Sequence, residues 1–575
     1  VKFGLDSSPN QYFYSKGDNV PHADTFVITI TSNNRLQVQG MVDDGETHNV
    51  ITTRQFRDST AWYHIVVAVD TTQTTNSNKI CIYVNGVKET AFDGTPSYPG
   101  TNALLAMNWY VGDSIIEMIG DYRAAPHADY KINGCIAEYH SVDGLSFFSN
   151  TSGAANSSFN INSFGEFKEG IWIPVAYTGA HGTQGYHLKF NNESVGTGAS
   201  DTVGADSAGS NHWTSTEILT TDCNNFDCPE NNVCVMNSID RRFGNVAGVS
   251  GSTTNGLLLS STSSTSNTTH HFGTHTINEV ASQGGVYFEF RVVTLDPSRF
   301  YIGLVATSSF VNNSANAATM ATYDFPLNVQ LAVAANYIYI NGVSTDFRTG
   351  NTVFAAGEVG GMAILSNGKV FIHREGTYLK DTSGNVGNPS TGANPITTID
   401  LTTYKWQPCF GYADSASHFN FGQDPTFDGN ESEPDPVKRD ANGIGKFLFD
   451  VPTNCLALCS SNMEDPTIIE SKKHFGVVAY DGNGSNNAVS GVGFRPDWIW
   501  SKDRNGTENH IWLDSTRGNT HRLSSNNTDN ETTDSNVTLA ESDSGQFAQS
   551  DGFTLTQYHD SNLSSSTNVA WCWKA

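Results

Sequence analysis

Hydrophobic and polar residues alternate in short runs along most of this chain, and the clearest run covers residues 61–88. The segment WYHIVVAVD is apolar on both faces of an extended strand, and ICIYVNGV is rich in β-branched residues and ends on Asn-Gly. Such runs favour strands, and Asn-Gly is a strong hairpin signal. The pattern predicts two paired strands, with the first inside a sheet. The residues expected in the core around them are Trp62, Val66, Ile82, Val84 and Ile136.

A second strand ending on Asn-Gly, YIYING, lies at residues 337–342. Strand-like runs surround it at 285–293, 299–306, 358–379 and 406–413, and helical periodicity is almost absent from the chain. The separation between the two Asn-Gly hairpins is too long for a solenoid repeat or a propeller blade. Each hairpin is therefore predicted to lie in its own β-sandwich.

Shifts in composition divide the chain into five segments. Dense strand patterns fill the first, third and fifth, whereas Gly, Ser and Asn dominate the second, which has two short strand patterns around a Gly-rich turn at 171–190. The predicted fold class is all-β, with tandem antiparallel sandwiches of the jelly-roll type joined by extended connectors. We expect a sandwich, a connector, a second sandwich, a linker and a C-terminal β-rich module at residues 1–145, 146–236, 237–425, 426–445 and 446–575.

Composition agrees with a turn-rich β protein and narrows the class of partner. Charged residues make up 15% of the chain, and 53 residues are glycine. A formal net charge of −27 repels phosphate backbones, so nucleic-acid binding is not expected. The sequence has neither an apolar run of roughly 18–20 residues nor the pattern of a signal peptide, so membrane insertion is not expected. Because the chain begins at Val1 and ends on the strand-like VAWCWKA, we expect it to be a piece of a longer polypeptide.

Three groups of motifs carry a resemblance to a known family. They are GIWIPVAYTGAHGTQGYHLKF, the run from VYFEFRVV through GGMAILSNGKVFIHREGTYL to FNFGQDPTF, and GFRPDWIWSKDR, LDSTRG, DGFTL and VAWCWKA near the end. Together they resemble tail-fibre-like structural proteins of tailed bacteriophages, especially marine ones. In that family a laminin-G-like or concanavalin-like module, a SPRY-like sandwich and a C-terminal module follow one another. The resemblance covers nearly the whole chain. The chain differs from the family pattern in the abbreviated first strands of the laminin-G-like module and in the Cys-rich stretch 223–234.

The resemblance implies a structural protein on the surface of a virion, in the tail or another external appendage, which is assembled in the host cytoplasm. Its implied partners are other virion proteins and a host receptor, either a glycan or a protein. A homo-oligomer, a trimer, is expected because the 146–236 connector alone would bury little apolar surface to offset its ordering entropy. Two alternatives stay open, a secreted or cell-surface carbohydrate-binding adhesin and a glycan-degrading enzyme.

Jelly rolls include glycanases, so catalytic carboxylates are the first chemistry to consider. Retaining hydrolysis needs two carboxyl groups about 5–5.5 Å apart, and no strand pattern carries E-x-D-x-E or E-x-D-x-x-E. The nearest acidic cluster, Glu431, Glu433 and Asp435, falls in the Pro-containing loop ESEPDP, where we expect a solvated linker. No catalytic or cofactor-binding residue is predicted.

The nine cysteines show no regular spacing. The segment 223–234 invites a zinc interpretation, but it lacks paired C-x₂-C spacing and a close fourth ligand. A disulfide there, or between Cys455 and Cys459, is an alternative against which cytosolic assembly argues. The cysteines of the cluster are Cys223, Cys228 and Cys234. Those expected as small buried side chains are Cys81, Cys135 and Cys572.

Two further patterns have features of metal sites, although no metal ligand is predicted. His270, His271 and His275 lie in TTHHFGTHT, where exposed positions at a strand edge are expected and a trimer axis is the alternative that would gather them around a metal. The loop DGNGSNN at 481–487 lacks the Gly and Glu of an EF-hand, so a turn is expected. The laminin-G resemblance leaves calcium open elsewhere, at the module's rim.

Aromatic residues mark the C-terminal module. The motifs WIW and WCW place each tryptophan pair on one face of a strand, where it fills a core or stacks on a sugar ring. Core packing is expected for Trp498, Trp500, Trp512, Trp571 and Trp573. Several N-x-S/T triplets are expected to arise by chance in a chain rich in these residues, and they begin at Asn150, Asn156, Asn192 and Asn312, among others.

Overall fold

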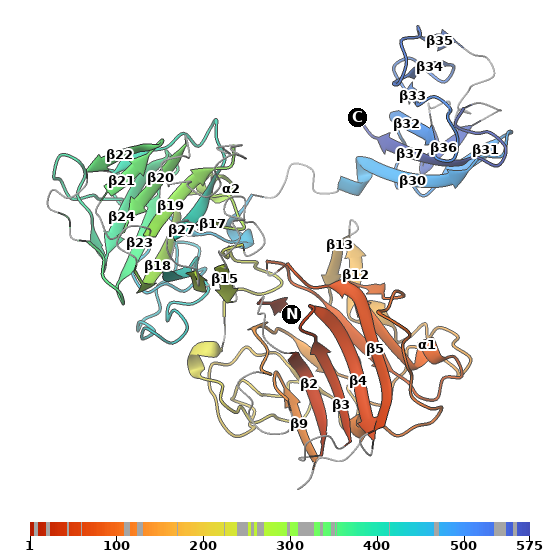
Figure 1. Cartoon of the computed structure of the whole chain (residues 1–575), viewed down its shortest axis with the longest axis horizontal. Coiled ribbons are helices and arrows are strands. Elements are labelled where there is room, and N and C mark those ends of the chain that lie inside the picture. Colours follow the sequence, from red (N-terminus) through yellow and green to blue (C-terminus); the bar gives the residue numbers. More distant parts are fainter. Residues whose placement is uncertain are drawn as a thin grey trace. The chain divides into compact units, whose positions relative to one another are not determined.

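In the computed structural model of the chain, the regular secondary structure is almost entirely β-strand (Figure 1). The chain forms two compact units. The first unit contains residues 1–165 and 174–464, and the second contains residues 166–173 and 465–575. Among the described residues, no helix is long and apolar enough to cross a membrane. The structure describes the whole chain except residues 5–9, 19–23, 43–44, 59, 109–114, 123–129, 169–170, 224, 238–250, 255–257, 262–268, 296–299, 309–326, 334–336, 347–350, 352, 413–414, 465–470, 534–547 and 556–559.

The first sandwich has its core between a five-stranded and a three-stranded antiparallel sheet. Phe26, Val38 and Val50 from the larger sheet and Ile82 and Val84 from the smaller are at most 1% exposed. In spatial order the larger sheet contains β5 (Gly45–Gln55), β4 (Arg35–Val42), β3 (Thr25–Ile30), β2 (Gln11–Asp18) and β9 (Ile115–Ile119), and the smaller contains β6 (Ile65–Val69), β7 (Ile80–Val84) and β8 (Val87–Lys88). The tetrapeptide helix α1 (Asn76–Lys79) precedes β7.

Both Asn-Gly hairpins predicted from the sequence are confirmed. Asn85 and Gly86, between β7 and β8, have φ of 48° and 75°. Asn341 and Gly342 have φ of 50° and 78° between β21 (Tyr337–Ile340) and β22 (Val343–Asp346). Positive φ at both central positions is what a type I′ turn requires, and Asn and Gly adopt it at low cost.

β6 is the edge strand of the small sheet, so the prediction that it lies inside a sheet is wrong. Both faces of β6 are apolar because both are covered. Ile65 packs on the first core, and Val66 packs on a separate aromatic cluster. That cluster consists of Phe147, Phe159 and Phe164. Residues 147–164 of the connector therefore cover the outer face of the small sheet.

The five residues expected in the first core divide into two groups. Ile82 and Val84 are buried as predicted, whereas Trp62, Val66 and Ile136 are only half-buried. Trp62 lies at the boundary with the connector because its indole Nε1 donates a hydrogen bond to Asp227 Oδ1 at 3.1 Å. A tryptophan with a polar partner does not need to enter the apolar core.

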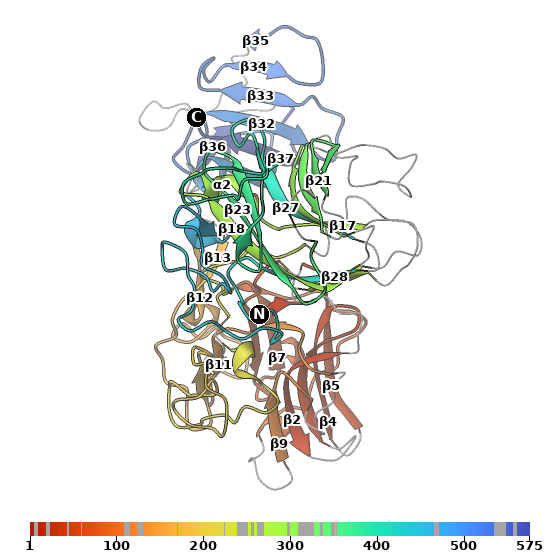
Figure 2. The same cartoon turned by 90° about the vertical axis from the view of Figure 1, so that its left-hand side faces the viewer.

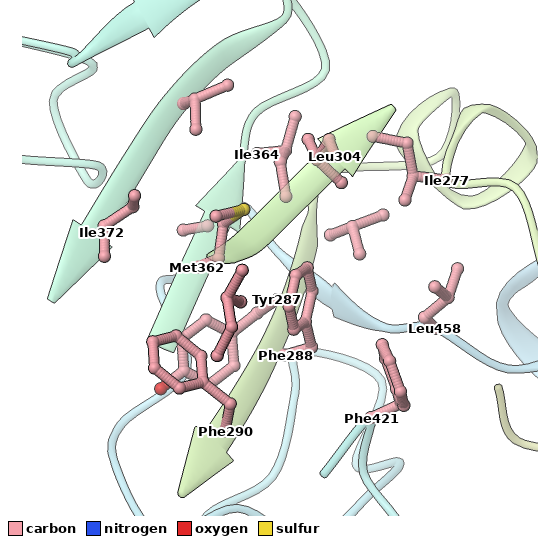
Figure 3. Close-up of a cluster of buried hydrophobic side chains, with 14 of the residues drawn as sticks. Ile277, Tyr287, Phe288, Phe290, Leu304, Met362, Ile364, Ile372, Phe421 and Leu458 are labelled. Atoms are coloured by element: carbon pink, nitrogen blue, oxygen red, sulfur yellow. The ribbon is translucent and has the colours of Figure 1, made fainter. Parts of the chain in front are cut away.

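The second sandwich has a core built from two large sheets, part of which Figure 3 shows. Phe288, Phe290, Met362, Ile364 and Leu304 are fully buried in it. The nine-stranded sheet contains β15 (Gly251–Thr254), β16 (Leu258–Ser261), β28 (Ala416–Asn420), β18 (Val286–Thr294), β23 (Val359–Ile364), β24 (Lys369–Arg374), β25 (Thr377–Tyr378), β26 (Thr397–Thr398) and β29 (Leu456–Ala457). The six-stranded sheet contains β17 (Thr269–Phe272), β27 (Trp406–Tyr412), β19 (Phe300–Ala306), β20 (Asn328–Ala332), β21 and β22. Helix α2 (Asn278–Ala281) follows β17.

Residues 446–464 belong to the second sandwich, so the module boundary expected at residue 446 is wrong. β29 pairs in parallel with β18, and Phe447 and Leu458 are fully buried in the second core. The expected linker 426–445 is also partly packed, since Phe427 is 1% exposed. The apolar run FLFDVPTN extends the second core instead of opening the third module.

A buried polar network holds this segment on β18. The Gly376 N–H donates to His373 Nδ1 at 3.2 Å, so Nε2 carries the ring proton and donates to the Tyr287 hydroxyl at 2.7 Å. That hydroxyl donates to Glu289 Oε1 at 3.0 Å, and Glu289 Oε2 accepts the Leu448 N–H at 3.0 Å. Satisfied networks of this kind rigidify a core because every polar group has its partner.

His373 gives the second sandwich an acid-sensitive contribution to stability, which Glu289 in the same network opposes because burial raises the pKa of that carboxyl to about 7. Burial lowers the pKa of His373 from its ordinary value of 6.5 to about 3. Below pH 6.5 the His373 ring is therefore protonated in the unfolded chain but stays neutral in the folded chain. This difference lowers the free energy of unfolding as the pH falls. His373 alone should lower the free energy of unfolding by about 2 kcal/mol between pH 6.5 and 5. Urea unfolding at the two pH values should therefore show that the change in stability between them differs by about 2 kcal/mol between wild type and His373→Gln, in the direction of a smaller acid loss in the variant, and an equal change in both proteins would contradict the prediction.

The C-terminal module encloses a third core between a six-stranded and a two-stranded sheet. Figure 2 shows four strands of the larger sheet, β32 to β35, lying side by side. The larger sheet contains β30 (Phe475–Asp481), β37 (Thr567–Trp573), β32 (Trp498–Asp503), β33 (Ile511–Asp514), β34 (His521–Ser524) and β35 (Thr532–Thr533), and the smaller contains β31 (Asn487–Ser490) and β36 (Gly552–Leu555). The predicted all-β fold of tandem antiparallel sandwiches is thus confirmed.

Candidate functional site

The cysteines predicted as a zinc or disulfide cluster do not form one site. All nine cysteines of the chain are free. Cys234, Cys455 and Cys459 are fully buried in the second core, whereas Cys228 is half-buried in a turn. Among the described residues, the grouping that could hold a metal contains no cysteine.

The histidines His270 and His271 are buried in β17, which corrects the expectation of exposed strand-edge positions. They pair with Gly411 and Phe410 of β27, and the His270 ring packs over the face of Gly411. His275 lies beyond the end of β17. Burial lowers the pKa of His270 to about 3, so its ring is neutral at pH 7.

The acidic loop and the glycine-rich loop have structural roles. Glu431 binds Arg291 with 2.8 Å between Oε1 and Nε, and Glu433 Oε1 lies 3.1 Å from Lys446 Nζ. In the 481–487 loop, the Asn483 N–H donates to the side chain of Asn562 at 3.1 Å. The loop is therefore a hydrogen-bonded turn, as expected.

The asparagines of the N-x-S/T triplets cap local turns. Asn150 Oδ1 accepts the Ser152 N–H at 3.0 Å, and the side chains of Asn156 and Asn192 do the same two residues onward. Short polar side chains are frequent in turns for this reason. Asn312 lies outside the described residues.

The tryptophans of the C-terminal module lie on the outer face of its large sheet, so the prediction that they fill the core is wrong. Ile499, Leu513 and Cys572 alternate with them and are at most 1% exposed in the third core. The tryptophans are half-buried instead. Alternation separates the two faces of a strand but does not state which face is buried, and the smaller side chains face the core here.

Strand register brings these tryptophans into one cluster, which we call the aromatic face. Trp498 lies opposite Trp573, and Trp500 lies opposite both Trp571 and Trp512. The Trp498 and Trp573 rings stack with centroids 4.4 Å apart at 25°, and Trp500 lies 5.1 Å from Trp571. Trp512 meets Trp498 edge to face at 5.7 Å and 79°. Offset and edge-to-face pairs are the arrangements that aromatic rings favour.

Two residues of β30 extend the aromatic face. Phe475 is 42% exposed with its ring centroid 5.0 Å from that of Trp573, and Val477 is 52% exposed opposite Trp571. The indole nitrogens of Trp500 and Trp512 are buried and have no hydrogen-bond partner among the described residues, so the face offers its apolar ring surface and not these donors. An apolar, aromatic surface of this kind is typical of a binding face.

The comparisons with known proteins match two parts of the chain. Residues 3–117 match a family described as the concanavalin A-like lectin/glucanases superfamily, and residues 470–575, which contain the aromatic face, match a family described as a domain of unknown function (DUF7483). Among solved structures the chain is similar to "Crystal structure of human SPRY domain", at 12% identity over 30% of this chain and 94% of that chain, with a TM-score of 0.21. No curated protein matches.

Proposed function

We propose that this chain is a non-enzymatic carbohydrate-binding protein in which the aromatic face of the C-terminal module stacks on sugar rings. The observation that carries the proposal is the outward orientation of Trp498, Trp500, Trp512, Trp571 and Trp573 on one sheet. The concanavalin-like match at 3–117 supports the same class of ligand, since that superfamily is described by its lectins and glucanases.

Sugar rings carry C–H groups on one or both faces and hydroxyls around the edge. An aromatic ring buries the C–H face and gains about 25 cal/mol per Å² of apolar surface removed from water. Arg517 and Asp514 form an ion pair beside Trp512, with 2.6 Å between Nε and Oδ2. These charged groups at the margin of the aromatic face offer hydrogen-bond partners for sugar hydroxyls. The ion pair also gives the Asp514 carboxylate a structural partner.

We further propose that the chain belongs to an external appendage of a bacteriophage particle and recognises a host surface glycan. The motif resemblance to tail-fibre-like proteins supports this placement. Several copies in one appendage would raise the avidity of a weak single site by roughly 10²–10⁴. Mass spectrometry of purified particles tests the placement, since a free adhesin would be absent from them.

The binding proposal predicts a selective loss in Trp500→Ala. Removing one stacking ring should cost about 1.5–3 kcal/mol, which is roughly 10- to 100-fold in Kd. Calorimetric titration of the full chain with oligosaccharides from bacterial surface polysaccharides measures this change. Trp213→Ala is the matched control, because Trp213 is half-buried in the connector against Tyr186. Equal binding by wild type and Trp500→Ala would contradict the proposal.

A further inference from the structure

One histidine from the end of the first sandwich segment and two from the connector meet on the first compact unit. His140 lies in β11 (Tyr139–Ser141) and His187 in β14 (Tyr186–Leu188), and the two strands pair so that these residues stand opposite each other. Their rings stack with centroids 3.9 Å apart. His181, from the Gly-rich turn before β14, places Nε2 at 3.1 Å from His140 Nδ1.

The backbone of the turn is shaped to hold His181 there. Gly182 has φ of +81°, and a Cβ on it would lie 2.5 Å from the carbonyl oxygen of Asp143. A Cβ on Gly185 would lie 1.9 Å from the carbonyl oxygen of His181. The Asp143 N–H in turn donates to that His181 oxygen at 2.8 Å. Glycine is therefore required at both positions for the turn to approach β11.

The histidines together carry the donor set of a transition-metal site. One nitrogen from each lies within 4.8 Å of the others, and zinc bound at about 2.0–2.1 Å from each nitrogen would draw them slightly closer. The rings are nearly parallel, with 3° between those of His181 and His187, so metal binding requires a ring to turn about χ2.

A carboxylate and a hydroxyl complete the surroundings. Glu138 Oε2 lies 2.5 Å from His187 Nε2 and 3.9 Å from His140 Nε2. Glu138 has φ of 52°, a left-handed conformation that a non-glycine residue adopts only where the surroundings impose it. Ser207 Oγ lies 2.9 Å from His187 Nδ1, the position of an outer partner that orients a ligating imidazole.

A polar cavity of about 660 Å³ opens beside these histidines. His181 and His187 line it together with the Gly-rich turn and the 207–211 loop. Asp206 shapes that loop, because its carboxylate accepts the N–H groups of His187, Ala208 and Asn211 at 2.9–3.0 Å. A small ligand or water in the cavity therefore meets His181 and His187 directly.

We propose that His140, His181 and His187 bind one divalent transition-metal ion of the zinc class, with the Glu138 carboxylate as an oxygen donor beside His187. Nitrogen donors favour zinc and its neighbours over calcium or magnesium, which prefer oxygen. The metal would join β11, the Gly-rich turn and β14. Binding would thereby fasten the connector to the first sandwich. This inference is independent of the aromatic face and of its glycan.

The test uses the full chain after removal of metal with a chelator. Titration with ZnCl₂ should give one bound ion per chain and a raised Tm, whereas CaCl₂ should change neither. Replacement of zinc with Co²⁺ should give the visible spectrum of a four-coordinate site with nitrogen and oxygen ligands. A thiolate-to-cobalt charge-transfer band should be absent, because the free cysteines are not ligands of this site. His181→Ala should weaken binding more than about 100-fold, since loss of an outer partner alone costs 10- to 100-fold.

His510→Ala is the control, because His510 lies in the C-terminal module outside the cluster. His181→Asn provides a second variant with a smaller change in the turn, and circular dichroism checks that both variants are folded. Absence of stoichiometric zinc binding, a thiolate spectrum, or equal affinity in wild type and both folded His181 variants would overturn the proposal.

Discussion

Asp227→Ala is expected to lower the free energy of unfolding of the first compact unit by about 3–5 kcal/mol, because the substitution leaves a buried cation without its partner. Asp227 Oδ2 lies 2.5 Å from Lys2 Nζ, and both side chains are only 4% exposed. Asp227 Oδ1 also accepts the Trp62 indole at 3.1 Å and the Val233 N–H at 3.4 Å. The carboxylate thus joins the N-terminal strand, the first sandwich and the end of the connector.

Guanidinium unfolding followed by tryptophan fluorescence measures this loss, since Trp62 reports on the site. Lys131→Ala is the matched control, because Lys131 and Glu217 form an ion pair whose side chains are 41% and 48% exposed. Exposed pairs contribute at most about 1 kcal/mol. If Asp227→Ala costs no more than the control, the buried pair does not hold the connector in place.

Ile499→Ala should destabilise the C-terminal module by about 2–5 kcal/mol, whereas Trp500→Ala, one residue away, should cost under about 2 kcal/mol. Ile499 is fully buried in the third core and leaves a cavity when truncated. Trp500 packs against neighbouring rings on the outer face and is half-buried. The order is unusual, because tryptophan truncation is ordinarily the costlier change.

Thermal unfolding of the two variants measures this order, with circular dichroism to follow the loss of strand structure. The comparison is matched, because both residues lie on β32 and pair across it with β37. A larger loss for Trp500→Ala would place the tryptophans inside the core and would remove the aromatic face.

Local chemistry explains which features of the fold were predictable from the sequence. The Asn85-Gly86 and Asn341-Gly342 turns follow from residues whose backbone preference is strong, so both hairpins could be placed correctly. The buried face of β32 could not, because a period of two is equally consistent with Trp500 or Ile499 facing inward. Packing between the two sheets of the module determines which face of β32 is buried, and no short-range sequence pattern indicates this.

Contacts between distant residues explain the other misses. β6 resembles an internal strand because the connector covers its outer face, and that cover comes from Phe147, far along the chain. The histidine cluster depends on the pairing of β11 with β14 and on glycines that admit the turn with His181. The histidines of EYH, AHG and YHL are unremarkable in sequence. Only the Gly-rich turn at 179–185 hinted that the backbone approaches another segment there.

The most direct test of the central claim is saturation-transfer NMR on the full chain with oligosaccharides from bacterial surface polysaccharides, with the sugar signals followed over time. Irradiation of the aromatic protons should saturate the ring C–H protons of the bound sugar in wild type and much less in Trp500→Ala, while the glycan stays intact. Equal saturation in both proteins would place the sugar away from the aromatic face. The release of new reducing ends would identify the chain as an enzyme and contradict the account.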